Sequence, residues 1–149
     1  MSLFLAIAIT AFISTIVSFI LGFIWYGPLF GKLWGTITHM DMNDHEKMAK
    51  MKKQMPYFYG VNFVLTFLMY YALGFSAALL VNPSYVRGII FFALFVWLGF
   101  IVPIAGSNAL WSGKSPKMSL KMFALTAGFQ LIALVLAGLV WVEVYPHLM

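Results

Sequence analysis

The sequence contains no cysteine, and few of its residues carry a charge. The absence of cysteine excludes disulfides, thiolate metal sites and cysteine nucleophiles. Charged residues make up 9% of the 149 residues, whereas a soluble domain carries about 25%. Hydrophobic residues make up 63%, which also excludes an intrinsically disordered chain. The composition therefore predicts a protein whose main solvent is lipid.

Four uncharged stretches are each long enough to cross a membrane as a helix. A hydrocarbon core of about 30 Å requires about 20 helical residues. The stretches are apolar on all sides, which excludes the alternating pattern of a membrane β-barrel strand. The sequence predicts one all-α membrane domain over 1–149, with spans at about 3–25, 57–81, 88–110 and 122–142.

The basic residues are distributed unevenly among the connections between these spans. Eight lysines fall between the first and second spans or between the third and fourth, whereas the middle connection holds only Arg87. Because positively charged loops stay in the cytoplasm, we expect both lysine-rich connections there and both termini outside the cytoplasm. The net charge of +5 is then explained by membrane orientation, and we expect no nucleic acid partner.

A short motif recurs in the two halves of the chain. Residues 21–24 and 98–101 both read Leu-Gly-Phe-Ile, and a Leu-Trp pair follows each motif, at 33–34 and at 110–111. This spacing predicts an internal repeat of two hairpins that share one orientation around an axis along the membrane normal. Chance similarity between membrane helices is the alternative.

Small residues occupy every fourth position of the first span, namely Ala6, Thr10, Ser14, Ser18 and Gly22. Such a stripe allows a second helix to approach closely and allows hydroxyls to bond across the contact. Packing within the chain is the favoured interpretation. An interface in a homo-oligomer is the alternative, because four short helices offer little buried core.

A proline near two glycines follows the first span. Pro28 lacks an amide donor and disfavours a helical Gly27, so we expect the chain to break there, at the membrane interface. Aromatic rings and lysines suit the headgroup region of the lipid bilayer. The alternative is that this turn folds back between helices and lines a site. The predicted interface anchors are Trp25, Tyr26, Lys32, Trp34, Trp111 and Lys114.

The stretch Trp-Tyr-Gly-Pro-Leu-Phe-Gly-Lys at 25–32 resembles a family of small bacterial four-helix membrane proteins that is catalogued as a domain of unknown function. Stretch 108–114 and the pair Gly128 and Phe129 are similar to further marks of that family. The resemblance extends over essentially the whole chain. It implies four spans and a location in the bacterial inner membrane, and it implies no activity.

The third span carries helix-breaking residues near its end. Pro103 removes a backbone hydrogen bond, Gly99 and Gly106 flank it, and Ser107 and Asn108 are able to satisfy the freed carbonyls. Transporters place binding sites at broken helices of this kind. Ordinary kinked helices have the same pattern, and that interpretation is the favoured one.

Two further amides lie inside the spans, Asn62 in the second and Gln130 in the fourth. Both are expected in the cytoplasmic half, near the depth of Asn108. The three amides predict a polar cluster, which either holds helices together or forms a permeation site.

The long connection after the first span contains histidine, aspartate and methionine, which are ligand types for copper or zinc. A helix accounts for this segment better. Asn43 is able to cap a helix with Glu46 three residues later, methionines form an apolar stripe, and Pro56 ends the run. We therefore expect an amphipathic helix at about 44–55 on the cytoplasmic leaflet, with no metal and no cofactor.

The sequence contains no nucleophile with a base, no paired carboxylates in a span and no phosphate-binding glycine loop, so we expect that the protein is not an enzyme. Two other functions stay open. The repeat, the broken helix and the amides favour a small oligomeric channel or permease for a small solute, which we rank first. The small-residue faces and the lack of buried charge favour a structural or accessory subunit bound to membrane protein partners.

Overall fold

The structure is a computed structural model that describes residues 1–38, 45–81 and 85–149, and these residues form helices with no strand. Four helical segments are long and apolar enough to cross a membrane, which confirms the four predicted spans. They are Leu3–Leu29, Met48–Leu80, Val86–Leu110 and Pro116–Leu148. The elements are α1 (Leu3–Ile24), η1 (Trp25–Leu29), α2 (Gly31–Thr38), α3 (His45–Leu80), α4 (Val86–Val96), η2 (Trp97–Ile101), α5 (Val102–Leu110) and α6 (Pro116–Leu148), where η denotes a π-helical segment.

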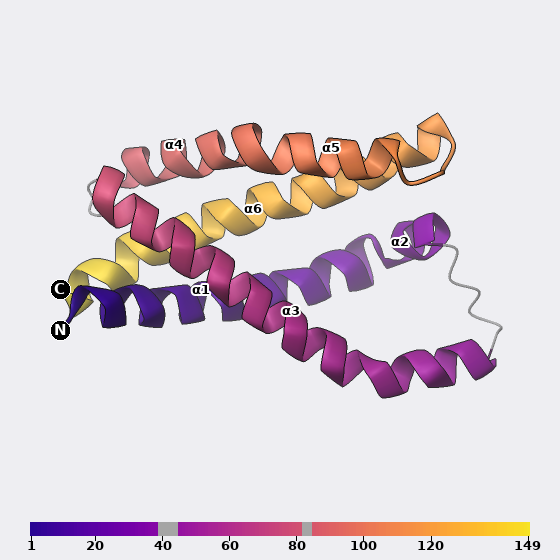
Figure 1. Ribbon diagram of the computed structural model, residues 1–149, viewed down its shortest axis with the longest axis horizontal. Coiled ribbons are helices and arrows are strands. Elements are labelled where there is room, and N and C mark those ends of the chain that lie inside the picture. The colour runs from indigo at the N-terminus through magenta and orange to yellow at the C-terminus, as the bar shows by residue number, and fades with distance from the viewer. Residues whose placement is uncertain (39–44, 82–84) are drawn as a thin grey trace.

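The two ends of the bundle differ in what they carry. Both chain termini lie at one end, and α2 lies with the turn between α5 and α6 at the opposite end (Figure 1). We call these the terminal end and the lysine-rich end, because the second carries the starts of α3 and α6 with their lysines. α6 packs against α1, α4 and α5, and α3 crosses α1 diagonally. α3 therefore diverges from α6 toward the lysine-rich end.

The small-residue face of α1 is buried inside the bundle, which agrees with packing within the chain. Ala6, Thr10 and Ser14 are fully buried, and Ser18 is nearly so. The hydroxyls of Thr10 and Ser14 donate to carbonyl oxygens four residues earlier, at 2.8 and 2.9 Å, and not to another helix. The prediction that hydroxyls of this face bond to a second helix is therefore wrong for Thr10 and Ser14, whose hydroxyls find their acceptors within α1.

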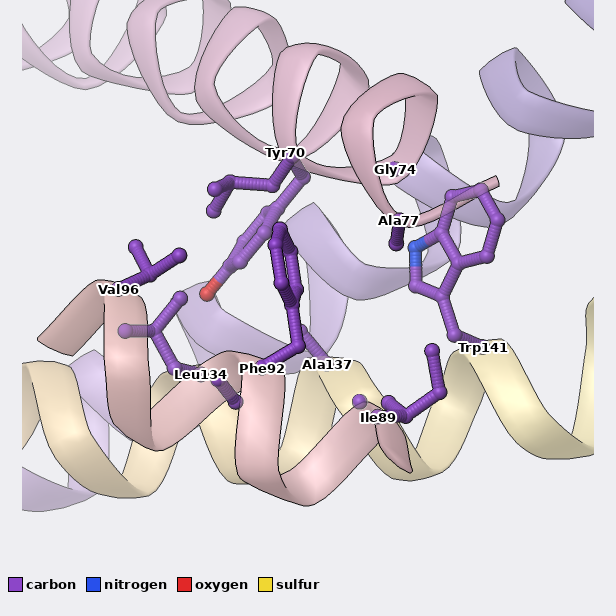
Figure 2. A pocket seen from close by; sticks show the side chains of 12 residues that line it. Tyr70, Gly74, Ala77, Ile89, Phe92, Val96, Leu134, Ala137 and Trp141 are labelled. Carbon is purple, nitrogen blue, oxygen red and sulfur yellow. The ribbon is translucent and has the colours of Figure 1, made fainter. Parts of the chain in front are cut away.

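The closest approach between α3 and α6 occurs at Gly74, in the terminal half. A Cβ atom at Gly74 would lie 1.9 Å from Cζ2 of Trp141, so no side chain fits unless the buried indole moves. A glycine inside a helix costs about 1 kcal/mol relative to alanine. Here it permits the indole to pack beside Gly74 and Ala77 (Figure 2).

A small apolar cavity of about 40 Å³ lies next to this contact, between α3, α4 and α6 (Figure 2). Its walls include Phe92, Val96 and Leu134. Cavities with apolar walls stay dry because water finds no hydrogen-bond partner in them. The mostly apolar walls of this cavity therefore disfavour water.

The sequence predicted a break of the first span at Pro28, but the structure shows no break there. The helix continues through η1, where the Phe30 amide donates to the carbonyl oxygen of Trp25 at 2.9 Å. This longer hydrogen bond passes over Pro28, so the missing amide donor does not end the helix. The chain turns only at Phe30, and the short helix α2 follows.

The third span also continues as a helix, from Val86 to Leu110, although the sequence predicted a break around Pro103, and it contains a π-helical segment that precedes this proline. α4 gives way to η2 at Trp97, and Pro103 lies near the start of α5, where a missing amide donor disturbs the helix least. The motif at 21–24 precedes the first π segment, whereas the motif at 98–101 lies inside the second. The repeated hairpin architecture therefore stays a prediction.

The amphipathic segment predicted at 44–55 is helical from His45, but Pro56 does not end it. α3 runs without a break from His45 to Leu80, so the prediction of a separate surface helix is wrong. A proline inside a helix removes one hydrogen bond, and the helix bends instead of stopping when the turns on both sides persist. The candidate metal ligands His39, Asp41 and Asp44 lie outside the described residues.

Candidate functional site

A groove of about 740 Å³ lies between α1, α3 and α6 in the lysine-rich half of the bundle. It forms where α3 diverges from α6 (Figure 1). Its volume is within the range of about 300–1,000 Å³ that is typical of small-molecule sites. Trp34 of α2 also contributes to its wall, so the segment after the first span takes part in the site.

Two of these helices present polar side chains to the groove at intervals of four residues. Asn62, Thr66 and Tyr70 line it from α3, and Thr126 and Gln130 line it from α6. Residues four apart lie on one face of a helix, so each helix turns one polar stripe toward the groove. Amides and hydroxyls inside a membrane are costly unless they find partners, so such stripes mark candidate sites.

A hydroxyl pair closes the deep end of the groove. The oxygens of Ser18 and Tyr70 are 2.5 Å apart, which links α1 to α3. Tyr70 is 2% exposed and lines both the groove and the small apolar cavity. This pair therefore marks the boundary between the polar groove and the dry core.

Aromatic rings form the remaining walls of the groove. Tyr26 lies 5.0 Å from Trp34 and 5.2 Å from Phe129, measured between ring centroids. Phe23 lies 5.8 Å from Tyr59, which brings rings of α1 and α3 together. These tilted and edge-on arrangements are the ones that aromatic pairs favour. Ring faces and edges are thus available beside the amides.

Two tryptophans, one in η1 and one in η2, donate hydrogen bonds to backbone carbonyls of α6 close to the groove. The indole nitrogen of Trp25 donates to the carbonyl oxygen of Leu125 at 3.2 Å, and that of Trp97 donates to Ala127 at 2.8 Å. An indole N–H inside a membrane requires such an acceptor. Each tryptophan is the first residue of a π segment. These bonds hold α6 on both sides of Thr126.

The described residues that line the groove include none with a charged side chain. Lys32 is exposed on α2, and Lys50 pairs with Glu46 at 3.2 Å on the surface of α3. Surface pairs of this kind contribute little to stability. The described lining is therefore uncharged, with amides and hydroxyls among apolar and aromatic side chains.

Residues 9–142 match the model of a protein family described as a protein of unknown function, DUF1761. The chain belongs to the DUF1761 family. No curated protein and no solved structure matches it. Membership confirms the resemblance to a domain family of unknown function, and the family name assigns no activity, so the function has to be argued from the groove.

The DUF1761 structure divides the polar cluster that the sequence predicted. Asn62 and Gln130 reach the groove, whereas Ser107 and Asn108 are exposed on α5 and do not line it. The prediction placed the three amides together by depth along the spans. Depth along a span does not determine which helices surround a groove, and α5, which carries Asn108, contributes no residue to the described lining.

The predicted interface anchors of the DUF1761 chain also separate into two groups. Tyr26 and Trp34 line the groove together with Gly27, which agrees with the alternative that this segment lines a site. In contrast, Trp111 is 88% exposed at the end of α5, and Lys114 follows it in the turn to α6. An exposed tryptophan at the end of a span suits the membrane interface.

Several residues of this region were not predicted from the sequence. Thr66, Tyr70 and Thr126 are groove residues that the four-residue spacing with Asn62 and Gln130 would have identified. Trp97 was also missed, although a tryptophan in the middle of a span needs a hydrogen-bond partner.

Proposed function

We propose that this DUF1761 protein is a small permease or channel, and that the groove between α1, α3 and α6 binds its solute. The polar groove inside a membrane-spanning bundle carries the proposal. The amides of Asn62 and Gln130 need hydrogen-bond partners inside a membrane. Lipid tails offer no such partners, so lipid alone in contact with this surface would leave both amides at a cost. A bound solute with water supplies those partners.

The closed end of the groove supports transport by alternating access. The Ser18–Tyr70 hydroxyl pair and the contact of Gly74 with Trp141 seal the terminal half. The bundle is therefore open toward the lysine-rich end. Passage of a solute requires α3 to separate from α6 in the terminal half. Other transporters open by hinge or gating motions of this kind.

The proposal includes the orientation and the assembly of the protein. The lysine-rich end faces the cytoplasm of a bacterial cell, and both termini lie on the outer side of the inner membrane, because eight of the nine basic residues are at that end. The chain works as a homo-oligomer, since one copy leaves the groove open between α3 and α6. A reporter fused to Met149 that is active only in the cytoplasm would contradict this orientation.

The cysteine-free sequence makes labelling of single cysteines a direct test of the permeation path. Asn62→Cys and Thr126→Cys should react with a membrane-impermeant thiol reagent added at the lysine-rich side. They should also react, more slowly, from the opposite side. Ala137→Cys beside the dry cavity should not react from either side, and Lys114→Cys should react only from the lysine-rich side.

Each labelling result has a distinct meaning. Reaction from both sides supports a permeation path, and reaction from one side only reduces the groove to a binding pocket. Protection of both groove cysteines from both sides would contradict the proposal and favour the second candidate, an accessory subunit.

One observation favours that second candidate function. The span Met48–Leu80 is the less buried of the two spans that pack against each other. In its most apolar stretch 17% of the residues are buried, compared with 39% in that of the span Leu3–Leu29. The exposed face of α3 offers a surface for a membrane protein partner. Purification with one partner at fixed stoichiometry, together with an unreactive groove, would establish this role.

A further inference from the structure

We propose that the groove selects an uncharged, planar aromatic solute that carries an amide or hydroxyl group. This inference rests on the solute-binding part of the proposed function and not on transport. Three properties of the described groove carry it: the absence of charge, the share of aromatic rings, and the pairing of rings with amides.

The charge of the groove excludes ionic solutes. Its described lining contains no carboxylate that would pair with a cation and no lysine or arginine that would pair with an anion. An unpaired ion loses more hydration than such walls return. Cations are further disfavoured because the chain has a net charge of +5, and eight of its nine basic residues belong to the lysine-rich end.

The aromatic share of the lining selects a flat apolar face. Seven of the 17 lining residues are aromatic, and they come from α1, η1, α2, α3 and α6. A ring that enters this space finds further rings at the distances already present between Tyr26, Trp34 and Phe129. Each such aromatic contact corresponds to about a two- to twelve-fold change in affinity.

The amides select the polar part of the solute. Asn62 and Gln130 each offer two donors and one acceptor oxygen, so together they match a solute that both donates and accepts. Thr66 and Thr126 add hydroxyls on the same two stripes. A sugar also combines hydroxyls with ring stacking, but phenylalanines such as Phe129 contribute no hydrogen bond to it.

The test is a comparison of matched ligands on the wild-type protein in lipid nanodiscs. Benzamide is the probe, and its affinity is measured by competition in equilibrium dialysis. Benzoate and benzylammonium change the charge, cyclohexanecarboxamide removes the aromatic ring, and xylose represents sugars. Benzamide should bind at least about five-fold more tightly than each of the other four, as expected for the loss of one ring contact or one paired polar group.

Matched variants locate the binding. Asn62→Leu and Phe129→Leu should each weaken benzamide binding about three- to ten-fold. The controls Asn108→Leu and Phe91→Leu make the same chemical changes outside the groove, where Phe91 is 72% exposed, and should leave binding unchanged. The ligand series on the wild type decides the question even if a groove variant fails to fold.

The two proposals fail in different ways. Equal binding of benzamide and cyclohexanecarboxamide, tighter binding of either ion or of xylose, or no benzamide binding at all would overturn this inference. Selective benzamide binding with thiol reaction from one side only would preserve the inference and overturn the permease. Thiol reaction from both sides without benzamide selectivity would support the permease and overturn this inference.

Discussion

The terminal half and the lysine-rich half of this bundle share the helices α3 and α6, yet they differ in packing. In the terminal half α4 joins them around a small apolar cavity of about 40 Å³, whereas in the lysine-rich half α1 joins them around a groove of about 740 Å³ that carries amides and hydroxyls. The difference is clear along α3, which presents Gly74 and Ala77 to the cavity and Asn62 and Thr66 to the groove.

In the terminal half, Gly74 has no side chain, and the indole of Trp141 packs against it. Toward the other end, the same helix presents Tyr59, Asn62 and Thr66 to the groove that separates α3 from α6 there. Gly74 therefore marks the part of α3 that packs against α6, and the polar stripe marks the part that faces the groove.

The largest expected effect concerns the core of the terminal half. Trp141→Ala should lower the free energy of unfolding by about 3 kcal/mol, the lower end for a buried aromatic, because lipid replaces part of the lost transfer energy. Unfolding in mixed micelles with increasing denaturing detergent measures it. The exposed Trp111 is the control, and Trp111→Ala should change stability by less than about 0.5 kcal/mol. Equal losses would mean that the terminal half is not the core.

The second prediction places the same substitution in both halves of α3. Gly74→Ala should destabilise the protein by about 1–3 kcal/mol, because its Cβ overlaps Trp141. Gly60→Ala adds a Cβ with nothing within 4 Å, and it should be neutral or stabilise the helix by up to about 1 kcal/mol. Thermal unfolding in detergent compares them. The same sign for both would remove the distinction between the halves.

A smaller effect is expected at the boundary between them. Tyr70→Phe and Ser18→Ala each remove the hydroxyl pair, and a double-mutant cycle should give a coupling of about 0.6–1.7 kcal/mol, as for other hydrogen bonds between membrane helices. If the coupling is zero, the hydroxyls do not join α1 to α3. The labelling rate of Thr126→Cys in the Tyr70→Phe background would then show whether the groove deepens.

The smallest effect is expected from the indole bonds to α6. Trp97→Phe removes a bond of 2.8 Å, and Trp25→Phe removes one of 3.2 Å, so the first should cost about 0.6 kcal/mol or more and the second less. Detergent unfolding of the two variants in parallel ranks them. The reverse order would indicate that Trp25 contributes more through its ring contacts with Phe30 and Phe129 than Trp97 does through its own packing.

The sequence was sufficient for the number, type and approximate limits of the spans, because their length and lack of charge decide these properties. It was not sufficient for the prolines. Pro28 and Pro56 satisfy the local rules for a helix break, but the turns on both sides persist and the helices continue. Local rules describe one residue, whereas the neighbouring hydrogen bonds decide the outcome.

The candidate site was predictable in part. Asn62 and Gln130 were identified as polar residues inside apolar spans, and both line the groove. Asn108 has the same chemistry but lies on α5, which does not line the groove, and a single sequence does not determine which spans pack around a given groove. Tyr70 was missed because a tyrosine in an apolar span does not reveal its partner Ser18, which is 52 positions away along the chain.

The contact at Gly74 also has a mechanical consequence. With a rise of about 1.5 Å per residue, the helix from Gly74 to Tyr59 forms a lever arm of about 22 Å. A tilt of about 10° around Gly74 would move the far end of this arm by about 4 Å, which is somewhat less than the pitch of about 5.4 Å of one helix turn. Because Gly74 and Trp141 are in contact, a tilt of α3 around this point would change the width of the groove far more than the spacing of the two helices at the contact.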